Sequence, residues 1–512
     1  MKNNIRRFGV ILKYITGTLI LILANVIYIV CTWVSEQFPN LDFSSIMFHL
    51  KVPLEDSNND TFTGIIIRCL ILAPIPALIG LIFAIKGASQ DVLVLQIKKI
   101  KLRFPLNFWQ KLFPLCSCFV LLCSIVFNSH FIGVDDYLRN QRSSSKLYET
   151  YYVDPQTTTV TFPEKKRNLI YIFMESMENT YSSPAYGGME YDNFIPEMTQ
   201  LQLENTNFSI TADTLNGGIS PSGTTWTMAA MVAQTAGVPL NIPIDGNSMD
   251  SYSTFLPGAY SIGEILESAG YQQEFLLGSD ITFGGRKLYM TQHGNYTLKD
   301  YNYAIEEGLI PSDYHVFWGY EDEKLYSFAK EELETLSSSD QPFNLTLLTV
   351  DTHFIGGYYC DLCQNTYGDD QYANVIACAS RQLADFISWV QEQPFYENTT
   401  IVISGDHPTM DTAYIEETIG DAAAGYQRSV YTVVINPACE YVLDYDRTFT
   451  TFDLYPTTLA SLGAEIEGDR LALGTNLFAD IPTLAEELGI EEFDRQLCQT
   501  SDYYSRHLLF GD

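Results

Sequence analysis

Two apolar runs of the sequence end in side chains that can bind a metal ion. Residues 168–174 lead directly to Glu175, and roughly 230 residues later the run 400–404 is followed by Asp406 and His407. In an open α/β sheet the ligand crevice lies at the carboxyl ends of the strands, so two such strands can deliver these groups to one place. Carboxylate oxygens with an imidazole nitrogen suit Mn²⁺, Mg²⁺ or Zn²⁺. The sequence therefore predicts a metal centre made by Glu175, Asp406 and His407.

A hydroxyl-rich segment supplies a candidate nucleophile. Residues 220–227 read Ser-Pro-Ser-Gly-Thr-Thr-Trp-Thr and precede a helix-forming run, which puts Thr224 at or near a helix N-terminus. The amide donors and positive dipole end found there favour an anion such as phosphate. A free threonine hydroxyl is a weak nucleophile, so metal coordination would be needed to form its alkoxide. We expect Thr224 to be both nucleophile and fourth metal ligand, although a simple Ser/Thr helix cap would give the same pattern.

Two further residues are candidates for contacts with a phosphoryl group. His353 follows the apolar run 345–350 and could hydrogen-bond a phosphoryl oxygen or protonate a leaving alkoxide. Arg286 follows Gly284 and Gly285, and a guanidinium can hold phosphate through two parallel hydrogen bonds. Taken singly, a histidine or an arginine is more often structural than functional. His353 and Arg286 are candidates because they could lie together at the site of the predicted metal ligands.

The pattern of elements from residue 167 onward predicts an α/β domain with a central, mostly parallel sheet flanked by helices. Short apolar runs alternate there with helix-like stretches. The predicted strands are 168–174, 272–277, 343–350, 400–404 and 430–435, and the predicted helices are 224–236, 260–269, 321–337 and 375–391.

The first 134 residues are predicted to form a membrane region. Apolar stretches at 14–33, 65–85 and 112–134 are each close to the ~20 residues that cross a bilayer. The loop 86–111 is basic, so the positive-inside rule places it and the N-terminus in the cytoplasm. Three crossings then leave a polar linker, 135–166, and the catalytic domain, 167–512, outside the plasma membrane.

Charge and cysteine content divide at the same boundary. Residues 1–134 carry a net charge of +6 and the remainder −39, and so acidic a domain argues against nucleic-acid binding. Five cysteines lie in or beside the apolar spans, where they act as small packing residues. Cys360 and Cys363 could form half of a zinc site, but a disulfide from Cys378 to one of them better fits an oxidising exterior.

Taken in order, these segments resemble the phosphoglycerol transferase and lipoteichoic acid synthase family, a branch of the alkaline phosphatase–sulfatase superfamily. The resemblance covers roughly residues 165–480 and rests on five ordered stretches: 168–176, 223–227, 348–353, 404–407 and 453–459, the last followed by 472–475. Within the family the chain looks nearer to phosphoglycerol transferase I, because of the stretches 226–240 and the placement of Cys360 and Cys378. Two features separate this chain from the lipoteichoic acid synthases. Those synthases usually have five membrane spans, whereas three are predicted here, and they place a substrate-stacking tryptophan where this chain has Gly284.

The resemblance implies one divalent metal, Mn²⁺ ahead of Mg²⁺ or Zn²⁺, held by Glu175, Thr224, Asp406 and His407. It makes Thr224 the nucleophile and assigns contacts with the glycerol phosphate to His353 and Arg286. The implied reaction transfers phosphoglycerol from phosphatidylglycerol in the outer leaflet to a glycan or glycolipid acceptor through a phospho-threonine intermediate. Three alternatives stay open: a phosphoethanolamine transferase, an extracellular phosphodiesterase, and a catalytically dead membrane-bound binding protein.

Overall fold

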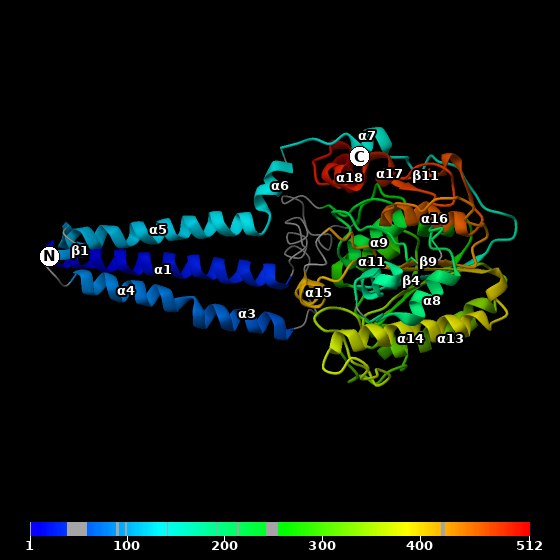
Figure 1. Ribbon diagram of the computed structural model, residues 1–512, viewed down its shortest axis with the longest axis horizontal. Coiled ribbons are helices and arrows are strands. Elements are labelled where there is room, and N and C mark those ends of the chain that lie inside the picture. The colour runs from blue at the N-terminus through cyan, green and yellow to red at the C-terminus, as the bar shows by residue number, and fades with distance from the viewer. Residues whose placement is uncertain are drawn as a thin grey trace. The chain divides into compact units, whose positions relative to one another are not determined.

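The structure is a computed structural model of the chain, and it describes residues 2–37, 59–88, 92–97, 100–140, 142–190, 192–211, 214–241, 254–420 and 425–511. The described residues fall into two units, one up to Leu138 and one from Arg139 onward. The first is helical and the second contains the sheet (Figure 1).

The N-terminal unit contains three stretches that are long and apolar enough to cross a membrane: Ile11–Val34, Ile65–Ile82 and Leu112–His130. The three predicted apolar stretches are thus helical in the structure. They lie in α1 (Lys2–Gln37), in α3 (Asn59–Leu72) with α4 (Pro74–Ala88), and in α5 (Leu106–Phe131). The second span breaks at Ala73, directly before Pro74, because proline cannot continue the helical hydrogen bonding. Between α4 and α5, β1 (Val92–Ile97) and β2 (Ile100–Pro105) form an antiparallel pair.

Polar side chains join the apolar helices of this unit. The Ser124 hydroxyl of α5 donates to the Ala24 carbonyl of α1 at 2.9 Å, and the Asn25 amide donates to the Ala73 carbonyl at 3.2 Å. Hydrogen bonds of this kind, together with small residues, hold helices together where lipid offers no hydrophobic gain.

The second unit is built around a six-stranded sheet with the order β6-β5-β7-β4-β8-β9. Its strands are β4 (Asn168–Met174), β5 (Gln272–Leu277), β6 (Thr297–Lys299), β7 (Phe343–Leu348), β8 (Thr399–Gly405) and β9 (Thr432–Ile435). All neighbouring pairs are parallel except β8 and β9. The predicted mostly parallel sheet is therefore confirmed, and the short edge strand β6 is an addition to it.

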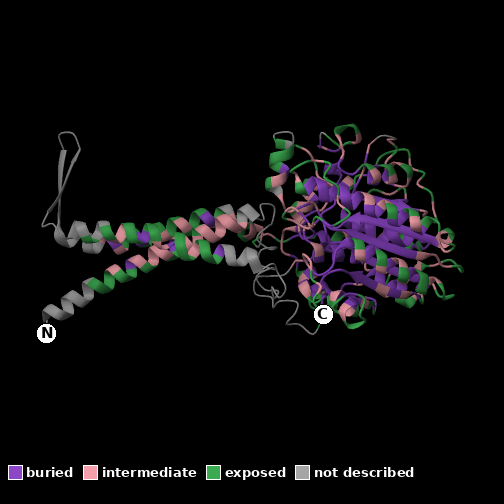
Figure 2. Ribbon diagram, turned by 90° about the horizontal axis from the view of Figure 1, so that it is seen from below, coloured by how far each residue is buried: buried purple, intermediate pink, exposed green. Residues whose placement is uncertain are grey.

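Helices cover both faces of this sheet, and the central strands are buried between them (Figure 2). Successive side chains of a strand point to opposite faces, so Leu169, Tyr171 and Phe173 belong to one apolar cluster and Ile170 and Ile172 to the other. The first cluster includes α9 (Thr227–Ala236), α10 (Ile262–Ser268), α11 (Arg286–Gln292) and α16 (Leu454–Ser461). The second includes α8 (Pro196–Glu204), α13 (Asp322–Ser337) and α14 (Gln371–Gln391).

The described residues also contain shorter α-helices and strands: α6 (Val134–Asn140), α7 (Leu147–Tyr151), β3 (Val160–Thr161), α12 (Tyr301–Glu306), α15 (Thr412–Ile419), β10 (Glu465–Ile466), β11 (Arg470–Leu471), β12 (Gly474–Thr475), α17 (Leu484–Leu488) and α18 (Ile490–Leu497). Several lie within the predicted linker 135–166. There α7 buries Leu147 and Tyr148, and Val160 of β3 pairs with Ile466 of β10. Most of this polar segment is thus attached to the α/β unit.

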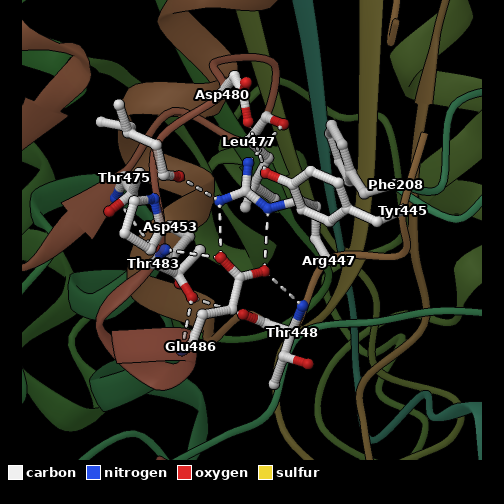
Figure 3. Close-up of polar contacts among 12 residues, drawn as sticks. Phe208, Tyr445, Arg447, Thr448, Asp453, Thr475, Leu477, Asp480, Thr483 and Glu486 are labelled. Atoms are coloured by element: carbon white, nitrogen blue, oxygen red, sulfur yellow. Dashed lines mark hydrogen bonds and ion pairs between the residues drawn. The ribbon is translucent and has the colours of Figure 1, made fainter. Parts of the chain in front are cut away.

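The C-terminal part is fastened to the unit by a buried arginine (Figure 3). Arg447 donates to both carboxylate oxygens of Glu486, at 3.0 and 3.1 Å. Its remaining donors bind the carbonyls of Leu477, Ala479 and Ile481 at 2.7–3.1 Å. The N–H donors of this guanidinium all bind oxygen atoms of residues 477–486. They hold that segment in place, because a buried guanidinium without hydrogen-bond partners would be very costly.

The predicted disulfide is not formed in this structure. The sulfur of Cys360 lies 3.5 Å from that of Cys363 and 3.8 Å from that of Cys378, so all three are free thiols. A disulfide requires about 2.05 Å between sulfurs. Cys360 lies between two partners at similar distances, and the arrangement therefore selects neither pair.

Candidate metal centre and active site

Strand order brings the predicted metal ligands together. β4 and β8 are parallel neighbours, with Met174 opposite Gly405, so Glu175 and Asp406 leave the same edge of the sheet side by side. One ligand atom from each of Glu175, Asp406 and His407 lies within 4.8 Å of the others, and all three residues are buried. Three ionisable groups collected in a buried position need either mutual neutralisation or a cation.

Asp406 has one carboxylate oxygen in use and one available. Its Oδ1 accepts hydrogen bonds from the backbone amides of Ser176, at 2.8 Å, and His407, at 2.7 Å. Its Oδ2 is buried and accepts no hydrogen bond. Burial, and next the neighbouring Glu175 carboxylate, raise the pKa of Asp406 well above its ordinary value. A divalent cation would use the available oxygen and, by stabilising the ionised carboxylate, oppose the raised pKa, so this residue fits a metal ligand.

His407 is oriented as a ligand by its other ring nitrogen. Nδ1 lies 3.0 Å from the Pro408 carbonyl, which can only accept, so Nδ1 carries the proton in this contact. The other ring nitrogen, Nε2, is the one left to bind a metal, and it lies 3.4 Å from Asp406 Oδ2 and 3.7 Å from Glu175 Oε1. Fixing the tautomer through a backbone carbonyl is how metal-binding histidines are usually held.

Glu175 stays ionised despite its burial. Burial alone would raise its pKa, but His353, His407 and the hydroxyls of Ser176 and Thr227 outweigh it, so that the pKa is lowered. The Ser176 hydroxyl donates to Oε1 at 2.8 Å. Ser176 adopts a left-handed backbone conformation, with φ of 52°. This turn allows its amide to reach Asp406 while its hydroxyl reaches Glu175, at the cost of some backbone strain.

The hydroxyl that reaches the cluster is that of Thr227, three residues beyond the predicted Thr224. Thr227 Oγ1 lies 3.3 Å from Glu175 Oε2 and 3.4 Å from His407 Nε2. The Thr224 hydroxyl instead donates to the Pro221 carbonyl at 2.7 Å, and its side chain is completely buried. The structure thus brings together Glu175, Asp406, His407 and Thr227, and it holds Thr224 in a turn.

Thr227 also occupies the helix position predicted for the nucleophile. It is the first residue of α9, and the preceding Trp226 is extended and provides no side-chain cap. The first amides of a helix have no partners within the helix, and the dipole is positive at that end. An anion approaching Thr227 therefore meets both amide donors and a favourable field.

Gln234 fastens α9 to the end of β8. Its amide nitrogen donates to the carbonyls of Gly405, at 3.0 Å, and Asp406, at 3.3 Å, while its oxygen accepts from the Tyr171 hydroxyl at 2.9 Å. Gln234 is fully buried. Because these bonds join α9 to β8 and β4, they set the distance between Thr227 and the three metal-binding side chains.

His353 and Arg286 are close enough to the cluster for their charges to affect it. Arg286 is buried, donates to the carbonyls of Phe283 and Asp280, and has a pKa lowered to about 10 by burial, against the attraction of Glu175. It is therefore still charged at neutral pH. His353 Nδ1 lies 2.6 Å from the Phe354 carbonyl, and burial lowers the pKa of its ring while Glu175 opposes the change.

Aromatic rings line the side of His353, and sequence reasoning missed them. We call Phe283, Phe317 and Trp318 the aromatic wall. The Trp318 ring centre lies 4.9 Å from that of His353 and 5.8 Å from that of Phe283, and Phe317 is 6.3 Å from Trp318. Trp318 is half-buried, so part of its surface is open to a ligand.

Some of these unpredicted residues leave a signal in the sequence, and others do not. Thr227 lies in the hydroxyl-rich segment, and its place directly before the run 228–236 was an available signal. The dipeptide Phe317-Trp318 was a weaker one, since two aromatic residues together are more often core. Neither Ser176 nor Gln234 shows in the sequence which partner it has.

The fold and the centre together define an α/β protein with a buried carboxylate–imidazole cluster that could hold a divalent metal, and with a threonine hydroxyl beside it. The sulfatase family profile matches residues 167–460, and the chain belongs to this family. The predicted resemblance is thereby confirmed.

The relatives include phosphoglycerol transferase I of Salmonella paratyphi B, 31% identical over 308 residues that make up 58% of this chain and 38% of the relative. The chain thus spans well under half the length of that relative. Among solved structures, the lipoteichoic acid synthase LtaP of Listeria monocytogenes is 19% identical, with a TM-score of 0.47 over 63% of this chain and 79% of that one. The lipooligosaccharide phosphoethanolamine transferase A of Neisseria meningitidis is 12% identical, with a TM-score of 0.48 over 88% of this chain and 84% of that one.

Proposed function

We propose that this protein is a membrane-anchored phosphotransferase that moves phosphoglycerol from phosphatidylglycerol to a hydroxyl of a glycan or glycolipid. The observation that carries the proposal is the contact of the Thr227 hydroxyl with Glu175 and His407 at the start of α9. A nucleophile, a metal-binding cluster and an anion-binding helix end meet there. The similarity to phosphoglycerol transferase I supports the choice of phosphoglycerol as the transferred group.

Glu175, Asp406, His407 and Thr227 would hold one divalent cation, and Mn²⁺, Mg²⁺ and Zn²⁺ all accept oxygen and nitrogen donors of this kind. When bound, the cation supplies charge neutralisation and lowers the pKa of a coordinated hydroxyl. The buried, unpartnered Asp406 Oδ2 is the feature of the protein that most directly calls for such an ion.

The proposed reaction has two displacements at phosphorus. The Thr227 oxygen attacks, its bond to phosphorus forms, and the bond to the diacylglycerol oxygen breaks, so that diacylglycerol leaves with a proton. A hydroxyl of the acceptor then attacks the same phosphorus, and the Thr227 oxygen leaves and regains its proton. Such a sequence divides one difficult transfer into two steps.

Arg286 and His353 would assist both displacements. The charged Arg286 guanidinium would oppose the negative charge of the equatorial phosphoryl oxygens, which is the main task in phosphoryl transfer. With His353 Nδ1 directed at the Phe354 carbonyl, its Nε2 is the nitrogen left to exchange a proton with the leaving or attacking oxygen. The aromatic wall would position the glycerol head group. It would take the role of the substrate-stacking tryptophan that lipoteichoic acid synthases have where this chain has Gly284.

The membrane region would keep the catalytic domain close to its lipid donor. Three spans would keep the domain at the membrane, where phosphatidylglycerol is concentrated. The basic loop 86–111 would place that domain on the outer side of the plasma membrane, with both donor and acceptor.

The test uses the purified full chain in vesicles with Mn²⁺ and a soluble glycoside as the acceptor. One set of vesicles contains phosphatidylglycerol labelled in its head group, and a second contains labelled phosphatidylethanolamine. We expect diacylglycerol and labelled phosphoglycerol products from the first set, and loss of both in the Asp406→Asn variant. Preferential use of phosphatidylethanolamine would favour the rival head group, and binding without turnover of either lipid would overturn the proposal.

A further inference from the structure

Three thiols gather at a second place in the α/β unit, apart from the centre described above. Cys360 and Cys363 lie in the segment that follows β7 and His353, and Cys378 lies in α14. One sulfur from each lies within 4.8 Å of the other two. Cys360 and Cys378 are buried and Cys363 is half-buried. The Cys363 amide donates to the Cys360 carbonyl at 3.1 Å, which closes the turn between them and directs both sulfurs to one side.

The spacing of the sulfurs matches that of thiolates around one metal ion. Zinc–sulfur bonds of about 2.3 Å in a tetrahedral site place neighbouring sulfurs about 3.8 Å apart. The separations here are 3.5 Å between Cys360 and Cys363 and 3.8 Å between Cys360 and Cys378. With three sulfurs at these distances, a single disulfide would also leave one buried or half-buried thiol without a role.

Gln382 provides a second, independent observation. It lies one helical turn beyond Cys378, and it is more than nine-tenths buried. Its Nε2 lies 3.5 Å from the Cys378 sulfur and 3.7 Å from that of Cys360, while its Oε1 is buried without a hydrogen-bond partner. The amide nitrogen of Gln382 therefore faces the sulfurs, while its amide oxygen accepts no hydrogen bond. N–H bonds to sulfur are the contacts that support thiolates bound to metals.

We propose that Cys360, Cys363 and Cys378 form a metal site for a soft or borderline divalent cation of the Zn²⁺ type. Water or the Gln382 carboxamide oxygen, after the amide turns over, takes the fourth position. The site differs in chemistry from the catalytic centre, whose donors are oxygen and nitrogen. It would fasten the segment that carries Asp351 and His353 to α14, and so hold His353 in place.

The experiment uses the full chain purified under reducing, oxygen-free conditions and loaded with Co²⁺, because thiolate ligands give cobalt an intense sulfur-to-metal absorption that oxygen and nitrogen ligands do not. The Asp406→Asn variant weakens the catalytic centre and isolates the signal of the thiols. Cys378→Ser and Cys363→Ser remove one ligand each. Cys439→Ser is the matched control, because Cys439 lies in the same unit and its thiol donates to the Ala460 carbonyl.

We expect the sulfur-to-cobalt absorption in the wild type, in Asp406→Asn and in Cys439→Ser, and its loss in Cys378→Ser and Cys363→Ser. Zn²⁺ should displace the cobalt and raise the melting temperature of Asp406→Asn. If a cysteine variant fails to fold, the spectrum of Asp406→Asn alone decides the question. Absence of the sulfur band in Asp406→Asn, or a thiol count showing two of the three cysteines joined in a disulfide, would overturn the site without affecting the proposed phosphotransferase function.

Discussion

Replacing Thr227 and Thr224 separately by valine distinguishes the hydroxyl that reacts from the one that stabilises a turn. Valine has nearly the shape of threonine, so each variant removes a hydroxyl and little else. The Thr227 hydroxyl makes long contacts, 3.3 and 3.4 Å, to Glu175 and His407. The Thr224 hydroxyl makes one short hydrogen bond, 2.7 Å, to the Pro221 carbonyl from a fully buried position.

The two variants should have opposite profiles: Thr224→Val should reduce stability more, and Thr227→Val should reduce turnover more. Thr224→Val should lower the free energy of unfolding by about 1 kcal/mol, the net value of one buried hydrogen bond, and leave turnover nearly unchanged. The loss should not be larger, because the Pro221 carbonyl still accepts from the Thr224 amide at 3.1 Å. Thr227→Val should change stability less than Thr224→Val, yet reduce turnover on the order of 10⁴- to 10⁶-fold, as for loss of an enzymatic nucleophile.

The assay pairs diacylglycerol release from phosphatidylglycerol vesicles with thermal unfolding of the same preparations. Thr227→Ser is the control, since it restores a hydroxyl at the same position and should recover part of the turnover. The reasoning is refuted if Thr224→Val abolishes turnover in a folded protein while Thr227→Val keeps it.

Three other residues give further predictions. Arg447→Met should lower the free energy of unfolding by about 3–5 kcal/mol, because three carbonyls lose their Arg447 donor and the Glu486 carboxylate keeps only the amide donors of Thr448 and Thr483 (Figure 3); a melting temperature equal to that of the wild type would contradict this. Trp318→Ala should raise the KM for the lipid donor up to about tenfold with a smaller change in kcat, if the ring positions the head group, and steady-state kinetics would measure both. Burial raises the pKa of Asp322 to about 7, and burial with Asp322 beside it raises that of Asp351 to about 10. Both lie above the unfolded value, so the folded state binds more protons and the free energy of unfolding should fall as pH rises from about 4, by up to about 1.4 kcal/mol per unit for each group. Denaturant titrations across this range should show a shallower slope for Asp351→Asn; an unchanged slope would refute the assignment.

The sequence predicted the cluster of Glu175, Asp406 and His407 because this part of the site follows from the sheet. Glu175 and the pair Asp406-His407 each come directly after an apolar strand, and parallel neighbouring strands end at one edge. The residues alone could not show that β4 and β8 are neighbours, which the structure supplies. The family resemblance implied only that Glu175, Asp406 and His407 share one site.

The hydroxyl that reaches the cluster could not be predicted in the same way, because its position depends on where a helix begins. Several hydroxyls occur within residues 220–227, and any of them could precede α9. The helix begins at Thr227 because Trp226 is extended, and α9 is positioned by Gln234 through contacts with strands far away in the sequence. Helix boundaries are set by such tertiary contacts as much as by local propensity.

The linker and the aromatic wall were difficult to predict for a related reason. Residues 142–166 are polar, yet Leu147 and Tyr148 are buried against the domain, which composition alone does not reveal. Trp318 lies in an irregular segment without periodicity, so the sequence does not indicate which face it takes.

The most direct test of the account is to trap the covalent intermediate and find its residue. The full chain would be incubated with phosphatidylglycerol and Mn²⁺ in the absence of acceptor, stopped in acid, digested and analysed by mass spectrometry. The account predicts a glycerophosphate adduct on the peptide containing residues 220–236, with fragment ions that place it on Thr227. An adduct on Thr224, or diacylglycerol release at full rate by Thr227→Val, would contradict it.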